Sequence, residues 1–236
     1  MNNIKTLAWD SDFFGFTIGQ VHITNNDEAY EFENVFNNSS FDLVYVTVAS
    51  ELIQNKISDT FHVEPIENKR TYALTDLVSP LVTAQHEIVE INQVTESLVQ
   101  LTFESGIESR FYKDLHFDKS AFEKLYRTWI EKSVNHELAD HVYGVFISNQ
   151  LAGFVTLSLK NDVTQIGLIA VDEEFRGKGI AKSLIAYCMM KTVQIGKGTI
   201  RIVTQAHNLA ACSLYESIGF KEISSVPLFH IWKTIC

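Results

Sequence analysis

The feature that most constrains the fold is an apolar run that leads through a short acidic turn into a glycine-rich loop and a long helical pattern. Residues 166–171 are typical of a buried strand, and residues 179–194 predict a helix. The loop between them contains Gly177 and Gly179. A helix that starts here presents unpaired backbone N–H groups and the positive end of its dipole beside the end of the strand. We therefore expect an α/β protein with a ligand site at this junction.

The loop itself has the composition of an anion-binding turn. Because Gly177 and Gly179 have no Cβ, backbone donors can approach a phosphate closely. Arg176 and Lys178 add positive charge. The loop predicts a diphosphate site, and the alternative is a basic surface turn. Neither the nucleotide P-loop pattern GxxxxGK[ST] nor the dinucleotide pattern GxGxxG fits these residues.

Further elements are expected on both sides of the junction. Strands are expected at 16–23, 41–48, 70–77, 87–91, 142–147, 151–159, 164–171, 199–204 and 229–233, and helices at 27–36, 95–105, 118–134, 179–194 and 209–217. Asp118 is a candidate N-cap, and Gly219 is a candidate residue just beyond a helix end. A change of pattern near residues 77–83 predicts an N-terminal α/β domain at 1–82 and a second domain at 83–236.

The composition narrows the classes of partner. A net charge of −10 and a pI of about 5.2 argue against nucleic acid, whose phosphates need clustered Lys and Arg. No apolar run reaches the roughly 20 residues that span a bilayer. The start of the sequence lacks a signal-peptide pattern, and the three cysteines are far apart, so we expect a cytoplasmic protein. No metal-ligand spacing occurs, so no metal is expected.

The strand and loop resemble motif A of the GNAT acetyltransferases, in the version R-G-x-G-[IL]-[AG]. The resemblance implies a GNAT fold, with a mixed sheet flanked by helices, and acetyl-CoA as co-substrate. It also implies which residues bind the cofactor. The strand residues Leu168, Ile169, Ala170 and Val171 would hold the pantetheine arm, and Arg176, Gly177, Lys178, Gly179, Ile180 and Ala181 would wrap the pyrophosphate.

A second motif, residues 208–220, is similar to the family pattern N-x-x-A-x-x-[LF]-Y-x-x-x-G-F. The resemblance makes Asn208 a helix N-cap, a pantetheine ligand, or both. It makes Tyr215 the proton donor, because a phenol with a pKa of about 10 can protonate a leaving thiolate at neutral pH. The alternative for Tyr215 is core packing. No metal is implied in this chemistry.

The group that takes the proton from the attacking amine is not decided by the sequence. His116, His141, His207 and Glu173 are candidates by residue type. A water molecule could also carry this proton, or the amine could bind in its neutral form. Structural or solvated roles remain open for each of the four side chains.

Four segments resemble a narrower group, the dTDP-fucosamine acetyltransferases. They are the opening W-x-x-x-F-F-G at 9–15, S-R-F at 109–111, Y-x-x-W-I at 126–130 and R-I-V-T-Q-x-x-N-x-x-A at 201–211. These enzymes acetylate the 4-amino group of a dTDP-linked 4-amino-4,6-dideoxygalactose and resemble a GNAT domain preceded by a smaller α/β domain. The resemblance therefore implies a nucleotide-linked amino sugar as acceptor. The residues 13–15 are interpreted as structural, with Gly15 at a tight bend.

Within the segment 109–111, Arg110 is a candidate partner for a diphosphate or carboxylate group of the substrate. Phe111 and Tyr112 are candidates for stacking on sugar or base. A surface ion pair for Arg110 and core packing for the two aromatic rings are the alternatives.

Two other functions stay open. The chain could acetylate a peptide N-terminus, a polyamine or a drug, or it could be a non-catalytic module that binds acyl-CoA. The sequence also leaves a homodimer open.

Overall fold

The computed structural model describes residues 4–77, 83–159 and 163–233. The chain divides into two compact units. The first unit comprises residues 1–69 and 225–236, and the second comprises residues 70–224. Two strands, β4 (Glu67–Leu74) and β10 (Lys221–Trp232), pass from one unit into the other.

The observed division differs from the boundary expected between residues 82 and 83. The end of β10 returns to the first unit, where residues 228–232 pair antiparallel with β3 (Leu43–Val48). Residues 70–77 belong to the second unit. Both differences arise because strands pair with strands that are distant in the sequence. Local changes of sequence pattern do not predict such pairing. Most of the expected boundary segment, residues 78–82, lies outside the described residues.

The first unit is a small α/β layer. Its strands are β1 (Lys5–Thr6), β2 (Ile18–Ile23), β3 and the end of β10, in that order, and its helices are α1 (Ala8–Phe14), α2 (Asn26–Asn37) and α3 (Glu51–Phe61). β2 and β3 run parallel, and the apolar faces of α2 and α3 share one core with them. The sequence analysis did not predict α1 or α3. α1 contains most of the aromatic opening motif and ends at Gly15, whose φ is +80°.

The second unit is larger and carries the site. Its strand order is β4–β9–β8–β7–β6–β5, with the start of β10 beside β4. Its strands are β5 (Val89–Glu90), β6 (His141–Ile147), β7 (Gln150–Ser158), β8 (Thr164–Val171) and β9 (Ile200–Gln205). Its helices are α4 (Glu96–Gly106), α5 (Arg110–Lys113), α6 (Lys119–Val134), the short 3₁₀ helix η1 (Glu173–Phe175), α7 (Ile180–Gln194) and α8 (Leu209–Ile218).

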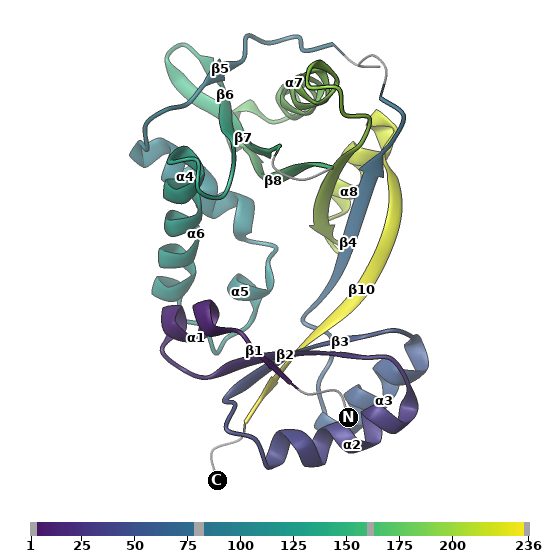
Figure 1. The fold of residues 1–236 in the computed structure, drawn as a ribbon. Helices are drawn as coiled ribbons and strands as arrows, with labels where there is room; N and C mark the ends of the chain where they lie inside the picture. Colours follow the sequence, from purple (N-terminus) through teal and green to yellow (C-terminus); the bar gives the residue numbers. More distant parts are fainter. Residues whose placement is uncertain (1–3, 78–82, 160–162, 234–236) are drawn as a thin grey trace. The chain divides into compact units, whose positions relative to one another are not determined.

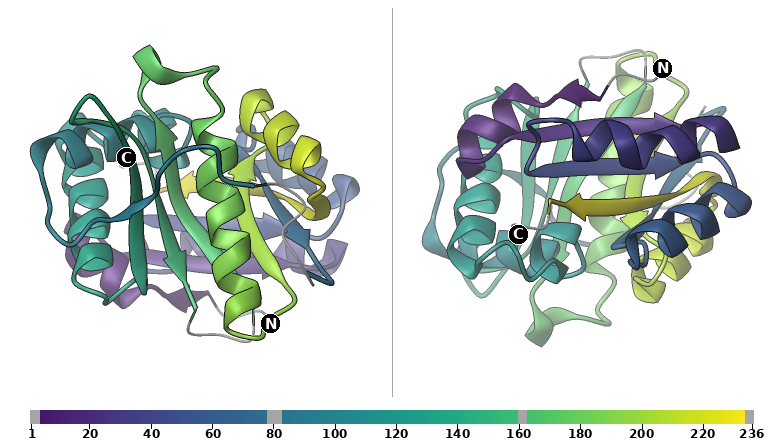
Figure 2. Two further views of the ribbon diagram at one scale, coloured as in Figure 1. Left: turned by 90° about the horizontal axis from the view of Figure 1, so that it is seen from above. Right: turned by 90° about the horizontal axis from the view of Figure 1, so that it is seen from below.

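Helices cover both faces of this sheet (Figures 1 and 2). Successive strand residues point to opposite faces, so Tyr143 and Val145 of β6 share a cluster with α7 and α8, whereas Val142 shares one with α4 and α6. Neighbouring strands from β5 through β6 and β7 to β8 pair antiparallel, and β8 pairs parallel with β9. The expected α/β fold with a mixed sheet flanked by helices is confirmed. No helix within the described ranges is long and apolar enough to cross a bilayer.

The expected helix ends are also confirmed where local chemistry sets them. Asp118 accepts a hydrogen bond from the Ala121 N–H at 2.7 Å and begins α6. Gly219 follows α8 with a φ of +107°. The last strand is longer than expected, because β10 starts at Lys221.

Gly106 at the end of α4 permits the close approach of α4 to α6. A Cβ built on Gly106 would lie 2.3 Å from Cζ of Tyr126 and 2.9 Å from Cε2 of Phe122, and both of these rings are buried. These distances are too short for any side chain at residue 106. The absence of a Cβ at this position therefore sets the spacing of the two helices.

We expect Gly106→Ala to lower the free energy of unfolding by about 1–3 kcal/mol, the usual cost of overpacking a core. Urea-induced unfolding followed by circular dichroism measures this change. Gly198→Ala is the matched control, because the atom nearest to its Cβ is 4.0 Å away. Equal stability of the two variants would contradict the packing argument.

Candidate active site

The site begins where two parallel strands of the second unit separate. β8 and β9 are paired at three positions only, Thr164 with Ile200, Gln165 with Arg201 and Ile166 with Ile202. Both strands continue beyond this point, to Val171 and Gln205. β8 remains paired with β7 over residues 169–171. Residues 167–171 therefore present one backbone edge that no strand covers within the described chain.

The alternation of the strand identifies the groups on this edge. The Asp172 N–H donates to the Ala152 carbonyl at 3.0 Å, and the Leu168 N–H donates to Thr156 Oγ1 at 2.8 Å, so the even-numbered amides point toward β7. The amides of Ile169 and Val171 point to the uncovered edge, because successive residues of a strand alternate. Of the four expected strand residues, these two present their backbone N–H groups to a ligand. The backbone N–H groups of Leu168 and Ala170 point toward β7 instead.

A β-bulge in β7 shapes the point where the strands separate. The pairing register of β7 with β8 shifts between Val155 and Leu157, and Thr156 lies at the shift. A Cβ at Gly167 would lie 2.7 Å from Thr156 Oγ1, so only glycine fits here without a shift. The bond from the Leu168 N–H to the Thr156 hydroxyl replaces a ladder bond. Gly167 and Thr156 were not predicted as site residues, and an isolated glycine within a strand pattern was the available signal.

The glycine loop has the backbone conformation that an anion site requires. Gly177 and Gly179 have φ of +77° and +78°, in the left-handed region that favours glycine. Gly179 is the N-cap of α7 and has no side chain to occupy the first turn. The unpaired N–H groups of this turn therefore face outward at the positive end of the dipole.

The two basic side chains of the loop have partners within the protein. Arg176 Nε donates to the Val171 carbonyl at 3.1 Å, and its terminal nitrogen lies 3.1 Å from Glu104 Oε2 of α4. Burial raises the pKa of Glu104, and the neighbouring guanidinium opposes this shift. Lys178 Nζ donates to the Glu174 carbonyl at 3.0 Å. In this structure Arg176 therefore connects the loop to β8 and α4.

A segment that the sequence analysis did not assign to the site lies beside the first turns of α7. The Gln85 N–H donates to the buried Ser183 hydroxyl at 3.0 Å, and His86 Nδ1 lies 3.3 Å from the same oxygen. Gln85 Oε1 is 3.5 Å from the position of a Cβ on Gly179. No local pattern in the sequence indicates this contact, because the partners are distant along the chain.

The second motif forms the β9–α8 connection. Asn208 Oδ1 accepts a hydrogen bond from the Ala211 N–H at 3.1 Å, so the expected N-cap is confirmed. This bond uses the side-chain oxygen and leaves the amide nitrogen of Asn208 for a ligand. The cap also fixes the start of α8, which carries Tyr215.

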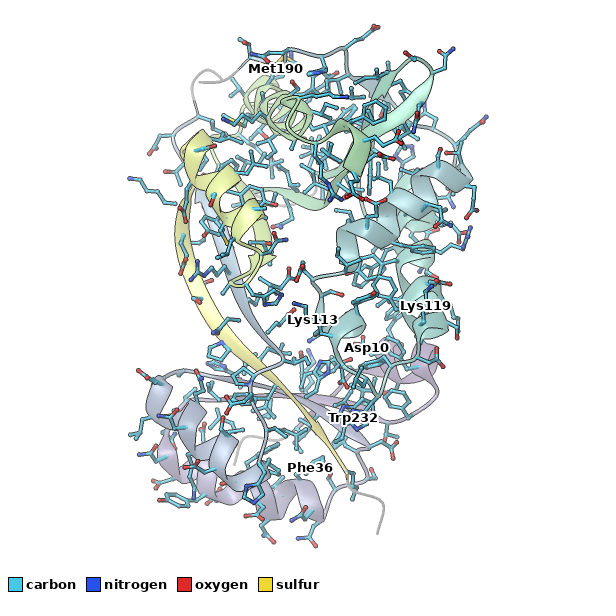
Figure 3. All side chains as sticks on the ribbon, turned by 180° about the vertical axis from the view of Figure 1, so that it is seen from behind. Asp10, Phe36, Lys113, Lys119, Met190 and Trp232 are labelled. Carbon is cyan, nitrogen blue, oxygen red and sulfur yellow. The ribbon has the colours of Figure 1, made fainter. Side chains whose placement is uncertain are left out.

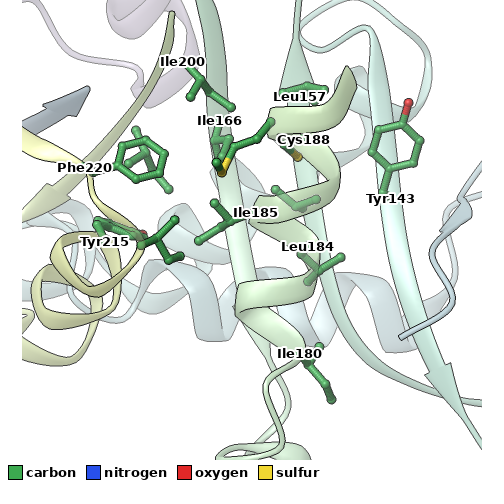
Figure 4. Close-up of a cluster of buried hydrophobic side chains, with 14 of the residues drawn as sticks. Tyr143, Leu157, Ile166, Ile180, Leu184, Ile185, Cys188, Ile200, Tyr215 and Phe220 are labelled. Carbon is green, nitrogen blue, oxygen red and sulfur yellow. The ribbon is translucent and has the colours of Figure 1, made fainter. Parts of the chain in front are cut away.

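Tyr215 lies in the core cluster beneath α7 and α8 and is 3% exposed (Figure 4). Its ring meets Tyr72 edge to face at a centroid distance of 5.8 Å and Phe220 at 6.2 Å. Burial raises the pKa of the Tyr215 phenol above its ordinary value, so the hydroxyl keeps its proton at neutral pH. Tyr72 anchors the same helix, because its hydroxyl donates to Glu216 Oε1 at 3.0 Å.

The three residues expected to bind the acceptor substrate have different surroundings in the structure. Phe111 is buried and packs edge to face on Phe117 and Trp129, as its core-packing alternative describes. Tyr112 is 51% exposed. The Arg110 guanidinium lies over the Phe111 ring at 4.7 Å. Phe111 is therefore the one of the three that belongs to the core.

The three candidate histidines each contact a carboxylate but lie in different places. His116 follows α5 and contacts Asp114 at 2.8 Å. His141 begins β6, contacts Glu90 of β5 at 2.5 Å and lies two strands away from β8. His207 lies in the β9–α8 connection, directly before Asn208. The fourth candidate, Glu173, is in η1 before the glycine loop.

Groups of three or more residues able to hold a metal ion are absent from the described ranges.

Comparison with known proteins identifies this arrangement. Residues 104–220 match the model of the acetyltransferase (GNAT) family. Streptothricin acetyltransferase of Escherichia coli is 30% identical over 149 residues, which cover 60% of this chain and 85% of that protein. The spore coat polysaccharide biosynthesis protein SpsD of Bacillus subtilis (strain 168) is 28% identical over 138 residues, 58% of this chain and 47% of SpsD, so the match spans about half of that protein.

A solved structure supports the fold over both units. The crystal structure of a functionally unknown conserved protein from Staphylococcus epidermidis ATCC 12228 superposes with a TM-score of 0.67, covering 99% of this chain and 93% of that one, at 12% identity. The chain belongs to the GNAT family of acetyltransferases.

Proposed function

We propose that the chain transfers the acetyl group of acetyl-CoA to the amino group of a nucleotide-linked amino sugar of the 4-amino-4,6-dideoxyhexose type. One observation carries the proposal. The uncovered backbone edge of β8 runs directly into the left-handed glycine loop at the start of α7. An amide-containing arm that ends in a diphosphate matches both parts, and the pantetheine diphosphate of acetyl-CoA has this composition.

In this proposal the backbone does most of the cofactor binding. The N–H groups of Ile169 and Val171 pair with the pantetheine amides, in the way that a further strand would. The glycine loop and the start of α7, residues 177–181, bind the pyrophosphate through backbone N–H groups. Arg176 holds the loop on α4 through Glu104, and Lys178 adds charge. The side-chain nitrogen of Asn208 is available to the pantetheine.

The chemistry is direct acyl transfer. The amine nitrogen attacks the thioester carbon, the new N–C bond forms, and the C–S bond breaks. Tyr215 gives its proton to the leaving sulfur, and this role is supported by a phenol that burial keeps protonated. The products are an amide and the free thiol of CoA.

The acceptor assignment rests on the segments around α5 and on the N-terminal motif. Arg110 presents a guanidinium suited to a diphosphate, and the exposed ring of Tyr112 can stack on a sugar or base. The similarity to SpsD, named for spore coat polysaccharide biosynthesis, favours a carbohydrate acceptor. The similarity to streptothricin acetyltransferase supports a second candidate, a small amine such as that antibiotic.

A panel of acceptors tests the substrate class. We expect dTDP-4-amino-4,6-dideoxygalactose to give a kcat/KM at least tenfold above those of streptothricin, spermidine and a peptide with a free N-terminus. CoA release, measured with a thiol reagent, reports each rate. Acetylation of streptothricin with no turnover of any nucleotide sugar would favour the second candidate. Binding of acetyl-CoA with no turnover of any acceptor would indicate a non-catalytic module.

The glycine loop can be tested with two matched substitutions. Gly177 and Gly196 have nearly equal φ of +77° and +75°, and a Cβ on either meets no atom within 4 Å. Alanine at either residue adds about 1–2 kcal/mol of backbone strain. We expect Gly177→Ala to weaken acetyl-CoA binding at least tenfold in calorimetric titration, and Gly196→Ala, at the far end of α7, to leave the Kd unchanged. Equal effects on the Kd would remove the loop from the cofactor site.

The proton donor can be tested in the same core cluster. We expect Tyr215→Phe to keep the ring packing and the acetyl-CoA affinity but to lower kcat about 10²–10⁴-fold, the usual contribution of a positioned acid. Tyr143→Phe is the control, because Tyr143 is equally buried at the other end of the cluster (Figure 4). Unchanged turnover of Tyr215→Phe would show that another group protonates the sulfur.

A further inference from the structure

The C-terminal end of α4 contacts the segments that follow both diverging strands. Glu104 pairs with Arg176, which lies beyond the end of β8. Glu108, four residues later in the connection to α5, contacts His207 beyond the end of β9. The same connection continues into Arg110 and Tyr112. His207 therefore lies between the β9 side of the strand separation and the segment assigned to the acceptor.

The contacts of His207 define its tautomer. Nε2 is 3.1 Å from the backbone oxygen of Glu108 and 3.1 Å from its Oε2. Both partners are acceptors, so Nε2 carries a hydrogen and donates it. Nδ1 makes no hydrogen bond to any residue in the described ranges. A neutral imidazole held in this way has its lone pair on Nδ1, ready to accept a proton.

An ionised carboxylate is in contact with the imidazole on the side of Nε2. Glu108 is the carboxylate in contact with the ring, and Lys113 of α5, labelled in Figure 3, lies 2.6 Å from Glu108 Oε2. The hydrogen bond from Lys113, together with His207, holds the pKa of Glu108 below its usual range, so this carboxylate is ionised at neutral pH. An ionised carboxylate on Nε2–H orients the ring and fixes which nitrogen carries the hydrogen, as in carboxylate–histidine pairs of hydrolases.

The other two candidate histidines have different surroundings. His141 is held at the β5–β6 edge by Glu90 and is stacked on Tyr143. His116 is bonded to Asp114 in the turn after α5. His141 therefore lies two strands away from the separation of β8 and β9, and the bonded partner of His116 belongs to its own turn. His207 combines a carboxylate partner, a defined tautomer and a position directly before Asn208, in contact with the connection that leads to Arg110.

We propose that Nδ1 of His207 accepts the proton that the acceptor amine loses as it attacks the thioester. This assignment rests on the proposed function. The neutral amine forms the N–C bond and gives one proton to His207, while Tyr215 gives one proton to the sulfur as the C–S bond breaks. Solvent then returns a proton to Tyr215 and removes one from His207, so amine and thioester yield amide and thiol with no net change in the protein.

The kinetic test uses saturating acetyl-CoA and dTDP-4-amino-4,6-dideoxygalactose. We expect wild-type kcat to fall as the pH is lowered, because a protonated imidazole accepts no further proton. We expect His207→Gln to lower kcat at least 10²-fold, to lose this acid limb and to bind acetyl-CoA with unchanged Kd. His141→Gln, which removes another carboxylate-bound imidazole, serves as control and should stay within twofold of wild type.

A His207→Gln enzyme that retains its turnover and its acid limb would overturn the assignment. A second measurement does not need an acceptor. Nitrogen-15 NMR of histidine-labelled protein with acetyl-CoA, assigned by the signal lost in His207→Gln, should show hydrogen on Nε2 and none on Nδ1 at pH 8. Hydrogen on Nδ1 would overturn the proposal even if the nucleotide sugar is not a substrate. Failure of the sugar to react, with the expected tautomer present, would instead count against the proposed acceptor alone.

Discussion

The parting of β8 and β9 after Ile166 and Ile202 is the constraint on which the rest of the site depends. Backbone N–H and C=O groups in a sheet are normally paired, and leaving them unpaired away from water is costly. The uncovered edge at Ile169 and Val171 therefore favours a ligand that can act as a missing strand. The amide arm of acetyl-CoA is such a ligand, and it needs no specific side chain to be recognised. This explains how the cofactor-binding edge can be built from aliphatic residues.

Keeping the strands apart requires support from the neighbouring strand. The bulge at Thr156 and the absence of a side chain at Gly167 bend β8 relative to β7, and the Thr156 hydroxyl satisfies the Leu168 N–H that the bulge removes from the ladder. α7 and α8 then pack on one face and α4 and α6 on the other. The site is thus an irregularity of backbone pairing that is held between two well-packed hydrophobic clusters.

The parts of the fold and site that are local in sequence were predictable. The strand–glycine loop–helix order, the caps at Asp118 and Asn208, and the left-handed Gly219 follow from residues close together in the chain. The return of β10 to the first unit was not predictable in this way, because it depends on pairing between residues 43–47 and 228–232. For the same reason the ion pair of Arg176 with Glu104, 72 residues away, was not predictable from the loop sequence.

Two carboxylates four residues apart, Glu104 near the end of α4 and Glu108 just beyond it, give this region a role that the apolar pattern of α4 does not indicate. Glu104 contacts the segment beyond β8, and Glu108 contacts the segment beyond β9, so a movement of the α4–α5 connection changes the surroundings of the cofactor loop and of His207 together. Arg110 and Tyr112 follow in the same connection. Under the proposed function, an acceptor bound at these residues would lie next to the contacts that reach both the glycine loop and His207. In the proposed site the residues for acceptor recognition follow α4, and His207 in the β9–α8 connection contacts the same segment through Glu108, while the cofactor is held by backbone groups that can remain unchanged as acceptors vary.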